Sequence, residues 1–418
     1  MKLDKFLLRY YPPGICLQYT QGGEVRSKVI DFLDLSPRTD VSELARSVAK
    51  NEPLVTPAVE NQLVDSLKKL QLKLFDTNLT FHKHRTLKSH LLPLTNVAFD
   101  KNGKKCLTGS YDRTCKLWNV DSGKEIFTLE GHQNVVYAVS FNYPFGDKVL
   151  TGSFDKTAKL WSSETGECLH TLWGHSAEVV SVQFNPVHQT VLTGSMDCTA
   201  RLYSLTTGQE EAVLKGHKGE VITAQFSTDG NQILTGSFDK TVRLWDIRLG
   251  KEVGVLVGHE EEISSCLFSF DSRLVVSSSL DKTAKIWDPR TLTCQWTVAG
   301  HNNEVLDVCL DYRGHHLASA SSDRTAKIWN IRGHPKLVST LKGHTEEVTK
   351  VCFSPGGRLI LTASEDQTAR IWNVDSGACN QLLQGHTDEV FSCAFNYNGD
   401  VIVTASKDNT CCIWKTHR

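Results

Sequence analysis

Histidine, a hydroxyl residue and aspartate recur together along the chain, and these are the residue types of a hydrolase triad. His132, Thr151 and Asp155 form one such set. In a triad the histidine takes a proton from the hydroxyl nucleophile while the aspartate orients the ring. Here the same set occurs eight times at nearly constant spacing. A residue set that is present in every repeat is typical of a structural frame, so the sequence predicts no catalytic residue and no enzyme.

The sequence offers no site for a cofactor or a metal either. His259 and Glu260 begin the zinc-protease pattern HExxH, but Ile263 stands where the second histidine would be. The glycines form neither GxGxxG nor GxxxxGK[ST], so no phosphate-binding loop is predicted. The 13 cysteines are an odd number without a CxxC pair, and we interpret them as small buried thiols in a reducing compartment.

Charge and hydropathy exclude further classes. The net charge of −1 gives no general attraction to nucleic acid or to an anionic membrane. No run approaches 18 apolar residues, and Asp4, Lys5 and Arg9 interrupt the N-terminal stretch where a signal peptide would be apolar. We expect a cytosolic chain that is monomeric on its own. Basic residues recur two positions before an aromatic residue, and we expect them to pair within each repeat: Lys116, Lys159, Arg201, Arg243, Lys285, Lys327 and Arg370.

The repeat has four marks in fixed register. An aspartate follows each histidine by 22 or 23 residues, a serine or threonine precedes that aspartate by four, and an aromatic residue follows it by six. The eight sets are His90-Thr108-Asp112-Trp118, His132-Thr151-Asp155-Trp161, His175-Thr193-Asp197-Tyr203, His217-Thr235-Asp239-Trp245, His259-Ser277-Asp281-Trp287, His301-Ser319-Asp323-Trp329, His344-Thr362-Asp366-Trp372 and His386-Thr404-Asp408-Trp414.

Between these marks the chain alternates between apolar and polar residues, as in VLTGSFDKTAKLW and VVSVQF, which indicates four short strands per unit of about 42 residues. Residues 80–418 resemble the WD-repeat family, although the WD dipeptide itself remains only at Trp245-Asp246 and Trp287-Asp288. The resemblance implies an all-β, eight-bladed β-propeller. It also implies that the four marks form a buried hydrogen-bond chain in each blade, which Tyr203 would loosen in the third.

Closure of the ring requires one more strand. The last unit ends at residue 418, just after its third strand, and its outer strand is missing there. Upstream of the first unit, HRTLKSH aligns with IFTLEGH of the next one. We therefore predict that residues 79–88 supply the outer strand of the last blade, within a propeller domain of residues 79–418, because an open edge would be a liability.

Residues 1–78 carry none of the marks, and we predict a small helical domain docked on the propeller. Asp40 and Glu43 form a capping-box pattern, and Thr56-Pro57 is typical of a second helix start. After it, one helical stripe of apolar residues follows: Val59, Leu63, Leu67, Leu70 and Leu74.

The resemblance also indicates which positions line the face that carries the histidines and aspartates, called the top face below. The residue before each aspartate is apolar in blades one to five: Tyr111, Phe154, Met196, Phe238 and Leu280. The third residue after the histidine is glutamate in blades three to eight: Glu178, Glu220, Glu262, Glu304, Glu347 and Glu389. The apolar arc either binds a protein partner or the docked N-terminal segment, or it packs into neighbouring loops. The glutamates either attract a basic segment or pair with nearby lysine and arginine.

The stretches KFLLRYYPPGICLQY and VIDFLDLSPRTDVSELARSVAKNEPLVT, joined to eight short blades, resemble WD-repeat assembly factors of axonemal outer-arm dynein. The resemblance implies a non-enzymatic adaptor in the cytoplasm and the cilium or flagellum, at the basal body and axoneme. Its partners would be preassembled outer-arm dynein and a subunit of the intraflagellar transport complex, the latter held in a groove between the helical segment and the top face. The alternative is a substrate receptor of a ubiquitin ligase or a general scaffold.

Overall fold

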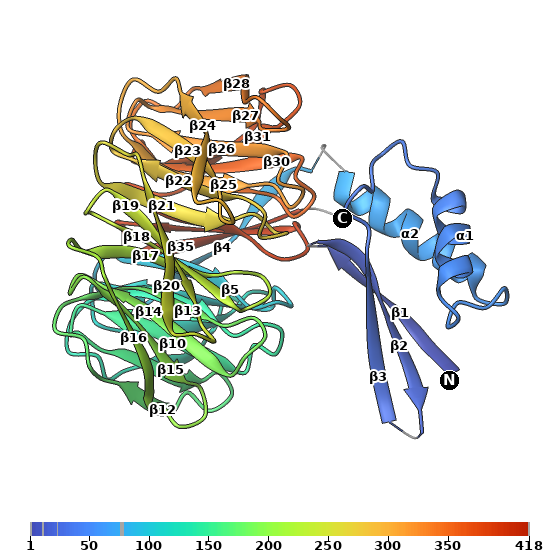
Figure 1. The fold of residues 1–418 in the computed structure, drawn as a ribbon, viewed down its shortest axis with the longest axis horizontal. Coiled ribbons are helices and arrows are strands. Elements are labelled where there is room, and N and C mark those ends of the chain that lie inside the picture. Colours follow the sequence, from blue (N-terminus) through green and yellow to red (C-terminus); the bar gives the residue numbers. More distant parts are fainter. Residues whose placement is uncertain (1, 11, 23, 76–78, 417–418) are drawn as a thin grey trace.

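The computed structural model describes residues 2–10, 12–22, 24–75 and 79–416. Its larger part is a ring of eight four-stranded antiparallel sheets, the blades (Figure 1). In seven of the blades the strands lie in chain order from the inner to the outer strand, and the eighth has the order β33-β34-β35-β4. This bears out the all-β, eight-bladed fold that the sequence predicts.

The strands of the first four blades are β5 (Leu94–Phe99), β6 (Lys105–Ser110), β7 (Cys115–Asn119) and β8 (Glu125–Leu129); β9 (Val136–Phe141), β10 (Lys148–Ser153), β11 (Ala158–Ser162) and β12 (Cys168–Leu172); β13 (Val179–Phe184), β14 (Thr190–Ser195), β15 (Thr199–Ser204) and β16 (Glu210–Lys215); β17 (Val221–Phe226), β18 (Gln232–Ser237), β19 (Thr241–Asp246) and β20 (Lys251–Val257).

The strands of the last four blades are β21 (Ile263–Phe268), β22 (Val275–Ser279), β23 (Thr283–Asp288) and β24 (Thr293–Ala299); β25 (Val305–Leu310), β26 (His316–Ser321), β27 (Thr325–Asn330) and β28 (Lys336–Lys342); β29 (Val348–Phe353), β30 (Leu359–Ser364), β31 (Thr368–Asn373) and β32 (Cys379–Gln384); β33 (Val390–Phe395), β34 (Val401–Ser406), β35 (Thr410–Thr416) and β4 (Phe81–Lys88).

The apolar core lies between neighbouring blades. Leu107 and Leu117 of the first blade pack with Val136, Val149 and Trp161 of the second, and the other interfaces repeat this arrangement. The inner strands contact one another around the ring, and β33 contacts β5. Each blade therefore depends on both of its neighbours for burial.

The last blade takes its outer strand from the start of the propeller. β4 pairs antiparallel with β35, with Leu87 opposite Cys411 and Phe81 opposite Thr416. The strand begins at Phe81, two residues later than the predicted position 79. The Phe81 side chain is 1% exposed and meets the ring of Phe395 edge-on at 6.2 Å. This strand gives β35 the hydrogen-bond partners that its edge would otherwise lack.

The prediction that the N-terminal domain is helical throughout was wrong. Residues 2–31 form an antiparallel sheet of β1 (Lys2–Tyr10), β2 (Pro13–Gln21) and β3 (Glu24–Asp31), in that order. Ile15 and Leu17 lie at alternate positions of β2 and are fully buried, and Gly22, which follows β2, has a positive φ of 63°. A period of two followed by a glycine pair is a hairpin signal, which the prolines obscured.

Both predicted helices are present, but the second begins at Glu60 rather than at the predicted start Thr56-Pro57, so Val59 of the predicted stripe precedes it. α1 (Val41–Asn51) begins after Asp40, whose carboxylate accepts hydrogen bonds from the backbone N–H groups of Ser42 and Glu43. α2 (Glu60–Phe75) buries the predicted stripe, with Leu63, Leu67 and Leu70 at 0% exposure. This stripe packs on Ile15 and Leu17 of the sheet, so residues 2–75 have a core of their own.

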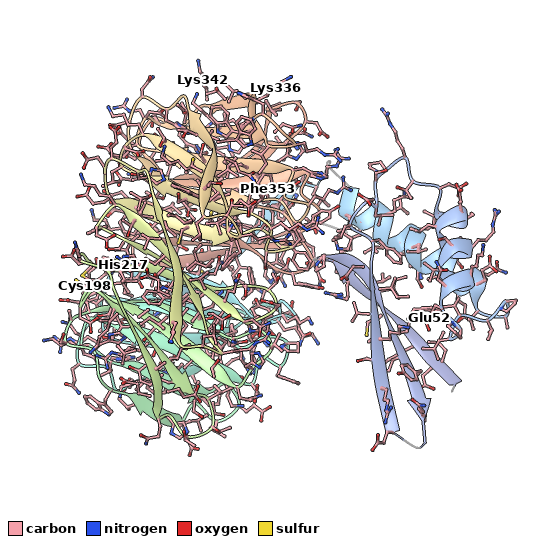
Figure 2. The ribbon with its side chains drawn as sticks, in the orientation of Figure 1. Glu52, Cys198, His217, Lys336, Lys342 and Phe353 are labelled. Atoms are coloured by element: carbon pink, nitrogen blue, oxygen red, sulfur yellow. The ribbon has the colours of Figure 1, made fainter. Side chains whose placement is uncertain are left out.

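The N-terminal domain lies on the face opposite the histidines and aspartates, called the bottom face here, which the loops between the first and second strands of each blade form. Tyr10 stacks edge-on against Tyr397 at 6.1 Å, Lys73 pairs with Asp400 at 3.4 Å, and the Arg313 guanidinium donates to the carbonyl of Leu35. Figure 2 shows His217 and Cys198 on the side of the propeller away from this domain.

The expectation of a groove between the N-terminal segment and the top face was therefore wrong. β4 ends two residues before His90, which lies on the top face, so β4 must begin on the bottom face. The chain that precedes β4 emerges there, and Figure 1 shows residues 2–75, in blue, beside that face.

Replacement of Phe81 by alanine tests the closure. Phe81→Ala removes a buried ring from β4 and is expected to lower the free energy of unfolding of the full chain by about 3–5 kcal/mol. Phe145→Ala is the matched control, because Phe145 is 75% exposed, and its effect should stay within about 0.5 kcal/mol. Calorimetry and denaturant unfolding measure both. Equal effects of the two variants would contradict a structural role for β4.

Candidate functional site

The predicted hydrogen-bond chain is present in the second blade. The His132 Nδ1–H donates to Asp155 Oδ2 at 2.8 Å, because an ionised carboxylate only accepts. His132 Nε2 is then free to accept from the Thr151 hydroxyl at 2.7 Å. The Trp161 indole N–H donates to the same hydroxyl oxygen at 2.9 Å. Each polar group in this buried chain has a partner.

The arrangement recurs in the other blades. The distance from histidine Nδ1 to aspartate Oδ2 lies between 2.6 and 2.9 Å in all eight. The set His217, Thr235, Asp239 and Trp245 of the fourth blade repeats that of the second. In the third blade Tyr203 differs, since its hydroxyl donates to the carbonyl of Trp173 at 3.1 Å.

Two further residues per blade complete the network, and the sequence analysis missed them. A serine two positions before the aspartate accepts from the aspartate N–H, as Ser153 does for Asp155 at 3.1 Å. A threonine two positions after it donates to Asp Oδ1, as Thr157 does at 2.7 Å. Both types are present in all eight units: Ser110, Ser153, Ser195, Ser237, Ser279, Ser321, Ser364 and Ser406, with Thr114, Thr157, Thr199, Thr241, Thr283, Thr325, Thr368 and Thr410. Their fixed spacing was the signal that could have found them.

These bonds keep the aspartates ionised. Burial alone raises the pKa of Asp155, but hydrogen bonds from His132, from Thr157 and from the N–H of Gln133 outweigh it and leave the pKa well below its usual range. For Asp239 the same balance lowers the pKa to about 2. The eight aspartates thus hold negative charge in tight turns whose next residue has a positive φ, such as Lys156 at 69°.

In the second blade the set holds a turn and does not present its hydroxyl as a nucleophile. Thr151 is fully buried, and its hydroxyl is already engaged by both His132 and Trp161. Among residues 2–10, 12–22, 24–75 and 79–416, no group of three or more His, Cys, Asp or Glu is placed to hold a metal ion. Within the same described ranges, no helix is long and apolar enough to cross a membrane.

The basic residues before the aromatics lie against the outer strand of their own blade. Lys116 pairs with Glu125 at 3.0 Å, and Arg201 pairs with Glu210. Lys159 donates to Thr171 at 2.9 Å. These contacts agree with the expected pairing within the repeat.

The predicted top-face residues lie on two adjacent turns of each blade. The apolar residue donates its backbone N–H to the carbonyl of the third residue after the histidine, as Phe238 does to Glu220 at 2.9 Å. Tyr111 and Phe238 are 43% and 41% exposed. Phe154 stacks on Tyr137 at 5.4 Å, whereas Met196 and Leu280 are half-buried. The structure therefore brings both predicted sets together on one face.

Two hollows lie on the bottom face where the N-terminal domain meets it. One, of about 550 Å³, lies between α2, β1 and the last blade and is lined by Leu8, Tyr10, Leu72, Lys73 and Asp400, among others. The second, of about 650 Å³, has Pro12 on one side and Tyr143, Phe270, Phe353 and Phe395 on the other. Sequence reasoning missed both hollows, because residues from both domains line them. Figure 2 shows Phe353 on the side of the propeller that faces the N-terminal domain. We call the two hollows together the cleft.

Two threonine variants test whether the buried hydrogen-bond chain stabilises the blade. Thr151→Val keeps the shape but leaves the His132 Nε2 and the Trp161 N–H unpaired, and we expect a loss of about 2–4 kcal/mol in the free energy of unfolding. Thr190→Val is the control, because the buried Thr190 hydroxyl oxygen has no hydrogen-bond partner in the structure, so its removal should be neutral or stabilising. Denaturant unfolding measures both. A similar cost for the two changes would show that the chain of bonds does not stabilise the blade.

The aspartates also predict a pH dependence. Because the folded-state pKa of Asp239 is about 2 and its ordinary value is 3.8, its contribution to stability is complete above about pH 4. It is lost as the pH falls from there through about 2. Asp239→Asn removes this titration, so between pH 4.5 and 2.5 its free energy of unfolding should fall less steeply than that of the wild type, by up to about 1.4 kcal/mol per pH unit. Parallel pH profiles would contradict the assignment.

Comparison with known proteins agrees with this geometry. The family model described as WD domain, G-beta repeat matches eight segments: 81–119, 123–162, 166–204, 208–246, 250–288, 292–330, 335–373 and 377–415. The crystal structure of the computationally designed Ika8 protein superposes with a TM-score of 0.71 at 30% identity, over 80% of this chain and 99% of that one.

Curated relatives named "Dynein assembly factor with WD repeat domains 1" are similar over part of the chain. The relative from Macaca fascicularis is 56% identical over 148 residues, and that from Homo sapiens is 55% identical over 148 residues. The match spans 35% of this chain and 36% of each relative, about a third of their length. The eight matched repeats, each with its hydrogen-bonded set, show that the chain belongs to the WD-repeat family.

Proposed function

We propose that the chain is a non-enzymatic adaptor for axonemal outer-arm dynein. The observation that carries this proposal is the 56% identity over 148 residues with a relative named as a dynein assembly factor. In the finer form of the proposal, the chain links preassembled outer-arm dynein to the intraflagellar transport machinery. It would therefore work in the cytoplasm and in the cilium.

The structure supports an adaptor in two respects. First, the residues that resemble hydrolase triads form the hydrogen bonds that hold the turns in place, and the Thr151 hydroxyl is buried. Second, the molecule has two separate surfaces, the top face and the cleft on the bottom face. The N-terminal domain, which lines the cleft, lies beside one face of the propeller (Figure 1), and the top face is the opposite one. An adaptor needs two surfaces that can be occupied at once.

We assign the transport subunit to the cleft and dynein to another surface. The cleft is concave and apolar, with Leu72 of α2 75% exposed beside it. Apolar side chains in a hollow between two domains are suited to bind an inserted segment of a partner. Lys73 at the rim is engaged with Asp400 and lies 4.5 Å from the Tyr10 ring, so the wall is held in place.

Replacement of an apolar residue of the cleft by a charged one tests the assignment. Leu72→Asp is expected to reduce recovery of transport-complex subunits with the tagged full chain from ciliated cells by about tenfold, since it places a carboxylate against the partner's apolar surface. Val253→Asp is the control, because Val253 is 44% exposed and lies in the middle of the outer strand β20, away from both faces.

Dynein recovery should persist in both variants. Unchanged recovery of transport subunits with Leu72→Asp would remove the cleft from the proposal. Absence of both dynein and transport subunits from wild-type samples would contradict the adaptor function itself.

A further inference from the structure

An aromatic patch is exposed on the top face at the first two blades. Tyr111 is 43% and Tyr137 is 42% exposed, and Phe154 stacks on Tyr137 with an interplanar angle of 23°. Backbone hydrogen bonds fix the turns, from Tyr111 to the carbonyl of Pro93 and from Phe154 to that of Val135, both at 3.0 Å. Rigid exposed aromatics at low conformational cost are typical of binding surfaces.

The glutamates of blades three to eight continue this surface with negative charge. All six are half-buried at the same turn: Glu178, Glu220, Glu262, Glu304, Glu347 and Glu389. Among the described residues, only Glu389 of these six forms an ion pair, with Lys407 at 3.1 Å. The alternative that the glutamates pair with nearby cations therefore holds for one position of six.

Two acidic residues that directly precede members of this set do form ion pairs. Glu261 pairs with Lys240 at 3.1 Å, and Glu346 pairs with Arg324 at 3.8 Å. Lys240 and Arg324 are thus paired with these acids rather than with any of the six. The negative charge of the glutamates affects Glu365: burial raises the pKa of this carboxyl, and repulsion from Glu347 and Glu389 raises it further. A surface with this charge selects a positively charged partner.

We propose that the top face binds a segment of another protein in which lysine or arginine side chains alternate with apolar side chains. The apolar side chains would contact Tyr111, Tyr137 and Phe154, while the cations would face the unpaired glutamates. A second copy of this chain does not fit, because two top faces carry the same charge and repel each other. The inference rests on the proposed adaptor function, to which it adds the chemistry of the partner bound at the second surface.

The test uses the purified full chain and defined peptides. A fluorescein-labelled peptide of twelve alternating lysine and leucine residues is titrated with protein, and a peptide of alternating glutamate and leucine is compared with it by fluorescence anisotropy. Only the lysine peptide should bind, and added salt should weaken its binding because salt screens the glutamates.

Variants locate the binding surface. Glu304→Lys with Glu347→Lys should weaken binding of the lysine peptide at least about tenfold. Glu164→Lys with Glu211→Lys changes the net charge equally at exposed residues off the top face, and should change binding less than about twofold. Tyr111→Ser, which keeps the charge, should also weaken binding.

Equal loss with the two charge variants would show general attraction between charges and overturn the proposal. Equal binding of the glutamate peptide, or no binding of either peptide, would overturn it too. Because these measurements involve neither the cleft nor a cell extract, their failure leaves the co-purification result for the adaptor function standing on its own.

Discussion

The last of the eight sheets has three strands from one end of the propeller segment and its fourth, outer strand from the other end, because β4 pairs with β35. The pairing joins residues that are more than 320 positions apart, so its closure entropy is offset only if every blade between them is in place. The direction of β4 also decides which face of the propeller the N-terminal domain covers. Since β4 runs from Phe81 on the bottom face toward His90 on the top face, residues 2–75 can dock only below, and the top face stays open.

The hydrogen-bonded sets explain why the repeats are so similar at some positions and so variable at others. A buried histidine, hydroxyl or carboxylate is tolerated only with all its partners present, so Thr151 or Asp155 cannot change alone. The neighbouring Phe154 has no such hydrogen-bond constraint, because only its backbone N–H bonds in the turn while its ring stacks on Tyr137. The frame therefore fixes the backbone of each turn and leaves one side chain beside the aspartate free to differ between blades.

The sequence predicted the propeller well because its signals are local and repeated eight times. The stripe that contains Leu63 and Leu70 was predictable because its spacing of three or four residues is a local signal within one helix. The sheet of residues 2–31 was missed because Ile15 and Leu17 are a short alternation seen once, between prolines. The side on which the N-terminal domain docks was missed although it follows from the direction of β4. The cleft could not be predicted, since tertiary packing alone brings Leu72 beside Asp400 in one hollow and Pro12 beside Phe353 in the other.

The last blade shows how β4 is matched to its position. In the third and fourth blades an arginine of the third strand, such as Arg201 or Arg243, lies over the glycine before the histidine. In the last blade that strand has Cys412 instead, and Lys83 of β4 occupies the space over Gly385, donating to its carbonyl at 3.0 Å. The cation thus comes from the outer strand, and the small thiol leaves room for it. Burial lowers the pKa of His386, but bonds to Asp408 and Cys412 raise it to about 9. An outer strand with lysine at the position of Lys83 complements only a blade whose third strand lacks a cation. The presence of Cys412 together with Lys83 therefore specifies where the ring closes.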